Sequence, residues 1–145
     1  MTETAKEQSL NPETIATLEV TETRTSFNEL DENVKLAISC ASDKKAFNIA
    51  ALDLRDIASF TEFFVITSGS NQRQVQAISD EINEQLKKQL SSKPVRVEGY
   101  NAAEWILMDY VDVVVHVFKK DKRGFYSLED LWGDAKLVNL SAIQV

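Results

Sequence analysis

The chain has 145 residues, 43% of them hydrophobic, and a formal net charge of −7. This length suits one domain of ordinary size, and the apolar fraction is sufficient for a hydrophobic core. No apolar run approaches the roughly 20 residues of a membrane-spanning helix, and residues 1–10 lack the apolar segment of a secretory signal. We therefore expect one cytoplasmic domain with no membrane association.

The chain contains one cysteine, Cys40, and one histidine, His116. A single cysteine excludes an internal disulfide, and the two residues together cannot supply the four ligands that a structural zinc site usually needs. Cys40 falls near the apolar stripe of a predicted helix, and His116 lies among valines. Both are expected to be packed core residues, and no cofactor is predicted.

The charge pattern argues against extensive nucleic-acid binding. Such binding usually needs a face rich in Lys and Arg that displaces counterions from phosphates. Here the basic residues are scattered among acids. An acidic surface is better suited to a basic protein partner, since it favours encounter with that partner and repels like-charged proteins.

Residues 1–25 are rich in Thr and Glu without periodicity, and we predict a disordered tail. Ser26 and Glu29 form a capping-box pattern in front of a predicted helix over 27–45. Residues 47–54 are apolar on both faces and end in charged residues, which indicates a buried strand. A second strand is predicted at 63–66.

A serine-capped turn at 68–70 is expected to lead into an amphipathic helix over about 71–90. Short strands follow at 95–98, 105–110 and 113–118, the last two forming a hairpin around Val111 and Asp112. A final helix is predicted over 122–132. Residues 62–98 form a strand–helix–strand unit, which favours two parallel strands joined by a right-handed crossover. We therefore expect an α/β (α+β) fold with a mixed five-stranded sheet flanked by helices, the domain covering 26–136 and a short tail 137–145.

Two groups of residues could be interpreted as parts of an enzyme active site. Gly69-Ser70, between a strand and a helix, could hold a phosphate and resembles the Gly-Ser signature of nucleotidyltransferases. Those enzymes also need paired carboxylates for magnesium, and the next strand offers only Arg96-Val97-Glu98. Asp109 and Asp112 could form an acid/base pair, although hairpin geometry explains Asp112 more simply. A serine-capped turn remains the simpler interpretation of Gly69-Ser70.

The segment 105–110 is the most informative for binding. Strand alternation separates Trp105, Leu107 and Asp109 from Ile106, Met108 and Tyr110, so one set should face the core. The other set is exposed if no helix covers it, and Trp and Tyr dominate binding hot spots. A sheet covered on both faces is the alternative.

A series of motifs resembles one known family, the ribosomal silencing factors, also called Iojap-like. The similarity covers about residues 30–136, in order and without large gaps. The matching segments are Phe60–Ser70, Gln72–Val75, Glu98–Gly99, Trp105–Tyr110, Asp112–Phe118, Phe125–Glu129 and Leu131–Asp134.

The resemblance implies a fold related to nucleotidyltransferases but without the catalytic acids, and no enzymatic activity. It further implies binding to ribosomal protein fourteen of the large subunit, a block on association with the small subunit, and repression of translation when nutrients are limiting. Family members often form homodimers in isolation, so the resemblance also implies a possible homodimer when the chain is free. The partner-binding positions implied here are Trp105, Ile106, Leu107, Asp109 and Tyr110.

The sequence departs from the family at two places. Residues 1–25 extend beyond a typical member, and Asn101–Glu104 replace a segment in which many members carry a glycine before the tryptophan. Three hypotheses stand at this point: an anti-association factor, a nucleotidyltransferase-fold enzyme that uses the Gly-Ser loop, and a homodimeric adaptor for another basic protein.

Overall fold

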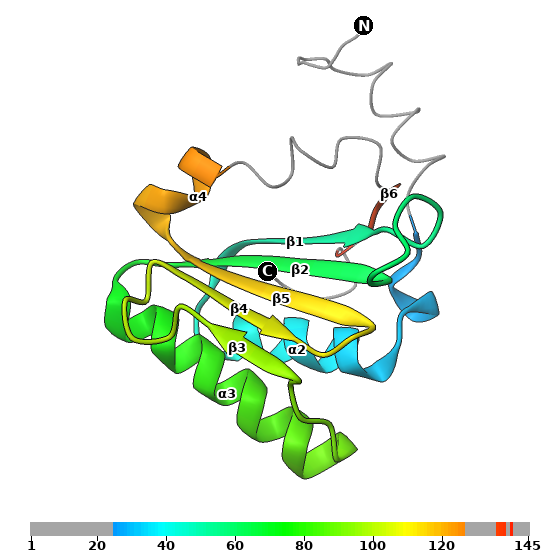
Figure 1. The fold of residues 1–145 in the computed structure, drawn as a ribbon, viewed down its shortest axis with the longest axis horizontal. Helices are drawn as coiled ribbons and strands as arrows, with labels where there is room; N and C mark the ends of the chain where they lie inside the picture. Colours follow the sequence, from blue (N-terminus) through cyan, green and yellow to red (C-terminus); the bar gives the residue numbers. More distant parts are fainter. Residues whose placement is uncertain (1–24, 127–135, 139, 141–145) are drawn as a thin grey trace, which may run out of the picture.

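The computed structural model describes residues 25–126, 136–138 and 140. Helices α2 and α3 pack on one face of a mixed six-stranded sheet, and α4 lies beyond one end of it (Figure 1). The elements are η1 (Phe27–Glu29), α2 (Glu32–Asp43), β1 (Phe47–Asp53), β2 (Phe63–Gly69), α3 (Gln72–Leu90), β3 (Arg96–Glu98), β4 (Trp105–Asp109), β5 (Val113–Lys119), α4 (Lys120–Tyr126) and β6 (Lys136–Leu137).

The strand order is β3-β4-β5-β2-β1-β6. Only β2 and β5 pair in parallel, and all other neighbours are antiparallel. The α+β class, the mixed sheet and the hairpin of β4 and β5 are thus confirmed. The expected number of strands was wrong: β6 adds a sixth, and it pairs with β1 through Leu52 and Leu137. The crossover from β2 by α3 reaches β3 at the sheet edge, with β5 and β4 between them.

The first predicted helix is divided. Residues 27–29 form a 3₁₀ turn, Leu30 and Asp31 are non-helical, and α2 begins at Glu32. The Ser26 side chain accepts a hydrogen bond from the amide of Asn28, so the expected capping box with Glu29 does not form. The predicted helix at 122–132 begins earlier, at Lys120, and its residues 127–132 lie outside the described residues.

The main core lies between the sheet and helices α2 and α3. Apolar side chains at helical spacing on α3, including Val75, Ile78 and Ile82, are fully buried there. They pack against alternate residues of β4 and β5 such as Ile106 and Val115. The two periodicities visible in the sequence therefore meet in one core, since burial of apolar surface is the dominant stabilising contribution.

A smaller apolar cluster occupies the opposite face of the sheet, which we call the far face. Its buried members come from three strands, β1 with the residue just after it, β2 and β5. Trp105 and Leu107 of β4 are packed against it while remaining partly exposed. The cluster consists of Leu52, Leu54, Phe64, Ile66, Val114 and Phe118.

The turn of the β4–β5 hairpin holds a β-branched residue in a left-handed conformation. Val111 has φ of 79° and is 59% exposed. The amide of Asp112 donates to the carbonyl of Tyr110 (3.0 Å), and the amide of Tyr110 donates to the carbonyl of Val113 (2.9 Å). Since valine rarely adopts positive φ, the backbone at this turn is strained.

Replacing Val111 by glycine should therefore stabilise the fold, by about 1 kcal/mol, because the release of strain exceeds the entropy that glycine loses on folding. Denaturant unfolding measures this change. The matched control is Val97→Gly on the exposed edge strand β3, where φ is ordinary and glycine should lower the free energy of unfolding. Equal destabilisation by both substitutions would show that Val111 is not strained.

Candidate partner-binding site on strand β4

Strand β4 presents three side chains on the far face: Trp105, Leu107 and Asp109, which we call the β4 strip. All three are partly exposed, whereas Ile106 and Met108 between them are fully buried. The pairing of β4 with β5 sets this alternation, since Leu107 lies opposite His116 and Met108 lies opposite Val115. The strip is thus an apolar and acidic row next to the edge strand.

The structure separates the five partner-binding positions that the resemblance implied. Trp105, Leu107 and Asp109 share the far face. Ile106 is 0% exposed and Tyr110 is 5% exposed, and both belong to the main core. Burial raises the pKa of Tyr110 to about 12, so its phenol stays neutral. In the free chain these two residues support the strip from beneath and present no surface of their own.

The centre of the far face is buried, whereas the strip is partly exposed. Phe64, Ile66 and Phe118 at its centre are each 5% exposed or less. The expectation of an uncovered sheet surface beside Trp105 therefore holds for one row of side chains and fails for the centre of the face.

Trp105 is fixed by two contacts with β5. Its indole Nε1–H donates to Nδ1 of His116 (3.0 Å), and its ring stacks on that of Phe118, with centroids 5.1 Å apart and an interplanar angle of 25°. A side chain held in this way loses little rotational freedom on binding, which favours affinity. The partly exposed indole is therefore an ordered anchor.

His116 is neutral and buried beneath the strip. Burial lowers its pKa to about 3, because the charged form would lose its hydration. Since Nδ1 accepts the indole proton, the ring hydrogen must be on Nε2. That Nε2 is buried and has no hydrogen-bond partner among the residues that the structure describes. The only histidine therefore positions Trp105 and is not suited to act as a base at neutral pH.

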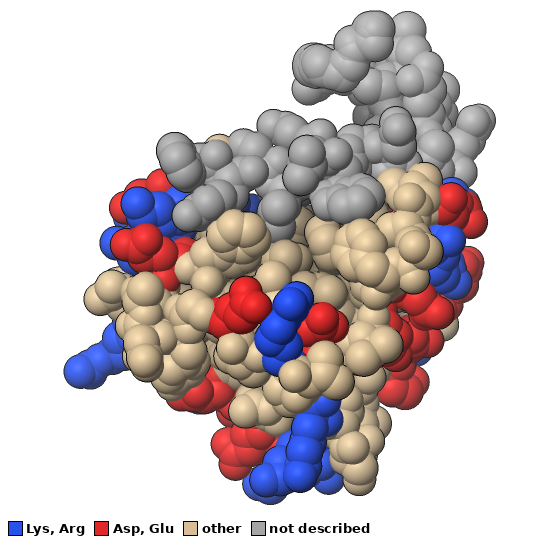
Figure 2. Space-filling model, viewed as in Figure 1, with Lys and Arg blue, Asp and Glu red and all other residues tan. Residues whose placement is uncertain are grey.

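The acidic end of the strip is tied to the turn and to β3. Asp109 Oδ1 accepts a hydrogen bond from the amide of Val111 (2.9 Å), and Oδ2 lies 3.6 Å from Nη2 of Arg96. Arg96 also contacts Glu98, with Nε 3.3 Å from the carboxylate. One guanidinium is thus shared by two carboxylates. In the space-filling view, two acidic side chains flank a basic one near the centre of the visible face, and most other charged side chains lie toward its margins (Figure 2).

The Gly-Ser loop is an ordinary helix start. Asn71, not a serine, caps α3: its side chain accepts from the amide of Gln74 (2.9 Å). The amide of Ser70 donates to Oε1 of Gln74 (2.6 Å). Within residues 25–126, 136–138 and 140, no group of three or more His, Cys, Asp or Glu side chains is arranged to hold a metal ion.

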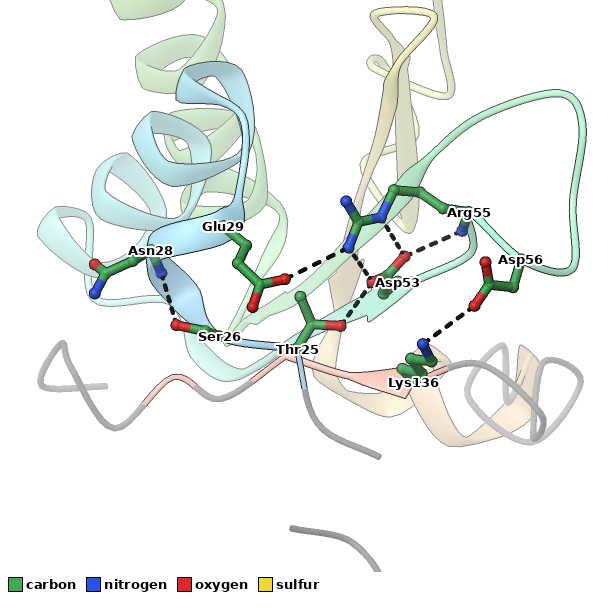
Figure 3. A network of polar contacts seen from close by, with 8 residues as sticks. All are labelled: Thr25, Ser26, Asn28, Glu29, Asp53, Arg55, Asp56 and Lys136. Atoms are coloured by element: carbon green, nitrogen blue, oxygen red, sulfur yellow. Dashed lines mark hydrogen bonds and ion pairs between the residues drawn. The ribbon is translucent and has the colours of Figure 1, made fainter. Parts of the chain in front are cut away.

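A polar network that the sequence did not reveal joins the start of the described chain to the end of β1 (Figure 3). Asp53, 5% exposed, accepts hydrogen bonds from Thr25 Oγ1 (2.6 Å) and from Arg55 Nη2 (2.7 Å) and Nε (3.0 Å). Burial by itself raises the pKa of Asp53, but the hydrogen bonds from Arg55 and Thr25 outweigh it and lower the pKa to about 2. Thr25 also bridges to Val138.

Removing this carboxylate should destabilise the fold strongly. We expect Asp53→Ala to lower the free energy of unfolding by about 2 to 3 kcal/mol, because the buried Thr25 hydroxyl loses its partner and Arg55 loses a charged acceptor. Asp56→Ala is the matched control, since Asp56 is exposed and pairs only with Lys136 at 3.1 Å among the described residues. A loss at Asp53 no larger than at Asp56 would contradict the assigned role.

No helix among the described residues is long and apolar enough to cross a membrane.

Comparisons with known proteins identify the family. The family model described as "Ribosomal silencing factor during starvation" matches residues 27–145. Ribosomal silencing factors RsfS from Halalkalibacterium halodurans and Bacillus subtilis are each 44% identical, over 77% and 74% of this chain and 95% and 90% of their own. A crystal structure of a Chromobacterium violaceum protein matches with a TM-score of 0.69 at 36% identity, over 72% of this chain and 87% of that one. The chain therefore belongs to the ribosomal silencing factor family of non-enzymatic, ribosome-binding regulators of translation.

Proposed function

We propose that the chain binds ribosomal protein fourteen of the large subunit through the β4 strip and thereby blocks association with the small subunit. The observation that carries this proposal is the strip itself: an immobilised Trp105 and an apolar Leu107 end in the carboxylate of Asp109. Rigid aromatic anchors with a polar rim are typical of protein interfaces.

The charge of the chain supports a basic partner. The formal net charge is −7, and the strip ends at a carboxylate that shares Arg96 with Glu98. A Lys or Arg of the partner can compete for Asp109 without leaving Arg96 unpaired, since Glu98 remains beside it. The bound protein would block the small subunit by occupying space, without catalysing a reaction. Stable binding would need an interface with the ribosomal protein on the order of 1,600 Å².

The nucleotidyltransferase alternative is set aside, because the family is non-enzymatic. The β3 residues in the position of the required acids also form an ion pair: Arg96 holds Glu98 at 3.3 Å. The expected homodimer of the free protein remains part of the proposal. The two copies would pair through the same β4 strip, so dimerisation and ribosome binding would compete for it.

Sucrose-gradient sedimentation tests the function directly. The protein should sediment with large subunits, and large and small subunits mixed in its presence should remain separate in place of forming complete ribosomes. Addition of the protein after the subunits have joined should have a smaller effect, since the surface is then covered. Normal subunit joining with saturating protein would reject the proposal.

A further inference from the structure

A pocket of about 420 Å³ lies between the loop that joins β1 to β2 and the turn of the β4–β5 hairpin. Arg55, Ala58 and Glu62 line it from the loop, and Val111 and Asp112 line it from the turn. Both segments lie at the end of the sheet remote from α4 (Figure 1). We call Glu62, Val111 and Asp112 the turn surface.

Backbone hydrogen bonds fix the two walls of this pocket relative to each other. The carbonyl of Asp112 accepts from the amides of Glu62 and Phe63, at 3.1 Å each. The amide of Leu54 donates to the carbonyl of Glu62 (2.8 Å) and thereby closes the base of the loop. The turn surface is therefore formed in the free chain, so a partner would not have to order it on binding.

The pocket has an excess of negative charge. Arg55, the cationic residue of its lining, already donates to both carboxylate oxygens of Asp53, at 2.7 and 3.0 Å, and lies 3.9 Å from Glu29 (Figure 3). Glu62 and Asp112 are different: within the described part of the chain, neither carboxylate has an ion pair or a side-chain hydrogen bond. Two carboxylates are thus available to a cation from outside the chain.

Val111 adds an exposed apolar side chain at the edge of the pocket. It is 59% exposed, and its φ of 79° is costly for a β-branched residue. The fold gains little from this side chain, because Val111 belongs to neither apolar cluster of the described residues. Backbone strain that the fold does not require is often kept where a side chain has a function.

We propose that the turn surface binds a lysine or arginine side chain of the basic ribosomal partner. The aliphatic part of that side chain would lie on Val111, and its cationic end would contact the carboxylates of Glu62 and Asp112. The turn surface directly continues the β4 strip, since the amide of Val111 donates to Oδ1 of Asp109 at 2.9 Å. The inference rests on the proposed function, because it adds a second contact with the same partner.

The variant Val111→Gly tests the apolar part of this contact. We expect glycine to raise the free energy of unfolding, because backbone strain is released, and yet to weaken co-sedimentation with large subunits by about fivefold, because an apolar contact is lost. A purely structural role of Val111 predicts that the more stable variant binds at least as well as the original chain. Unchanged or tighter binding by Val111→Gly would overturn the role of Val111.

The double variant Glu62→Gln/Asp112→Asn tests the charged part, since it removes two charges with little change in shape. Binding to large subunits should weaken by at least about tenfold, and the remaining binding should depend less on salt. The matched control is Glu84→Gln/Asp121→Asn, which removes two charges from exposed positions on α3 and α4 and should change binding by less than about twofold. Equal weakening by the two double variants would overturn the contact, because the net charge alone would then explain the effect.

The unmodified chain separates failure of this inference from failure of the proposed function. If it binds large subunits and blocks joining while Val111→Gly and Glu62→Gln/Asp112→Asn bind equally well, the turn surface is not a contact and the β4 strip remains the proposed interface. If the unmodified chain itself does not bind large subunits, the proposed function is rejected and the turn contact is rejected with it. Circular dichroism of each variant confirms that it is folded.

Discussion

The variant Trp105→Ala/Asp109→Lys should lose large-subunit binding by at least about 100-fold and should no longer prevent subunit joining. Alanine removes the ordered indole, and lysine places a positive charge where a basic partner is expected. Loss of a central aromatic anchor costs about 2 to 4 kcal/mol in many interfaces, and a like-charge contact adds to that cost. Binding by co-sedimentation and joining by light scattering give the two readouts.

This double variant also disturbs the free protein, because His116 and the amide of Val111 lose their partners. Leu107→Arg isolates the effect at the interface, since the Leu107 side chain makes apolar contacts and is partly exposed. Its matched control is Val97→Arg on the neighbouring strand, which is 43% exposed and points to the opposite face. The proposed interface is wrong if Leu107→Arg binds as tightly as Val97→Arg while both are folded by circular dichroism.

Stability should fall as the pH drops below about 6.5, and His116 should be the cause. Its pKa is about 3 in the folded chain and about 6.5 when unfolded, so below pH 6.5 the unfolded state binds a proton that the folded state excludes. The stabilisation is therefore present above pH 6.5 and is lost as the pH falls. Between pH 7 and pH 4.5 the loss should be about 2 kcal/mol.

The loss of stability in this pH range can be assigned to one side chain, because the chain has a single histidine. The lowered pKa of Asp53, about 2, adds a second loss with the same sign that begins only near pH 4. Urea unfolding from pH 7 to pH 4.5 measures the first loss, and His116→Phe should remove most of it. Persistence of the slope in that variant, or a histidine that titrates near pH 6.5 in folded protein by NMR, would contradict a buried neutral ring.

The loss of the His116–Trp105 hydrogen bond on protonation would also release the anchor of the β4 strip. Nδ1 can accept the indole proton only in the neutral ring. The stability of the fold and the order of the proposed interface therefore rest on the same pair of side chains.

The sequence predicted the elements that have a clear periodicity. Val75, Ile78 and Ile82 recur at helical spacing, and α3 lies within a residue of the predicted range. Alternation in 105–110 correctly separated Trp105 and Leu107 from their neighbours. These features could be predicted because local geometry and burial require the same pattern.

Elements held by long-range contacts were missed. Strand β6 has only two residues and exists through its pairing with β1, and Thr25 reaches Asp53 across 28 positions. Neither leaves a periodic signal.

The resemblance placed Ile106 and Tyr110 at the interface, whereas the fold of the free chain buries both. A matching motif does not distinguish residues that support a surface from residues that form it. The pocket beside the hairpin turn likewise depends on tertiary contacts.

The most direct measurement of the proposed interface is photo-cross-linking to purified large subunits from a benzophenone-labelled cysteine at position 107, in a Cys40→Ala background. The account predicts a cross-link to ribosomal protein fourteen from Leu107→Cys and little from Val97→Cys on the opposite face. Cross-linking to that protein from position 97 and not from position 107 would contradict it.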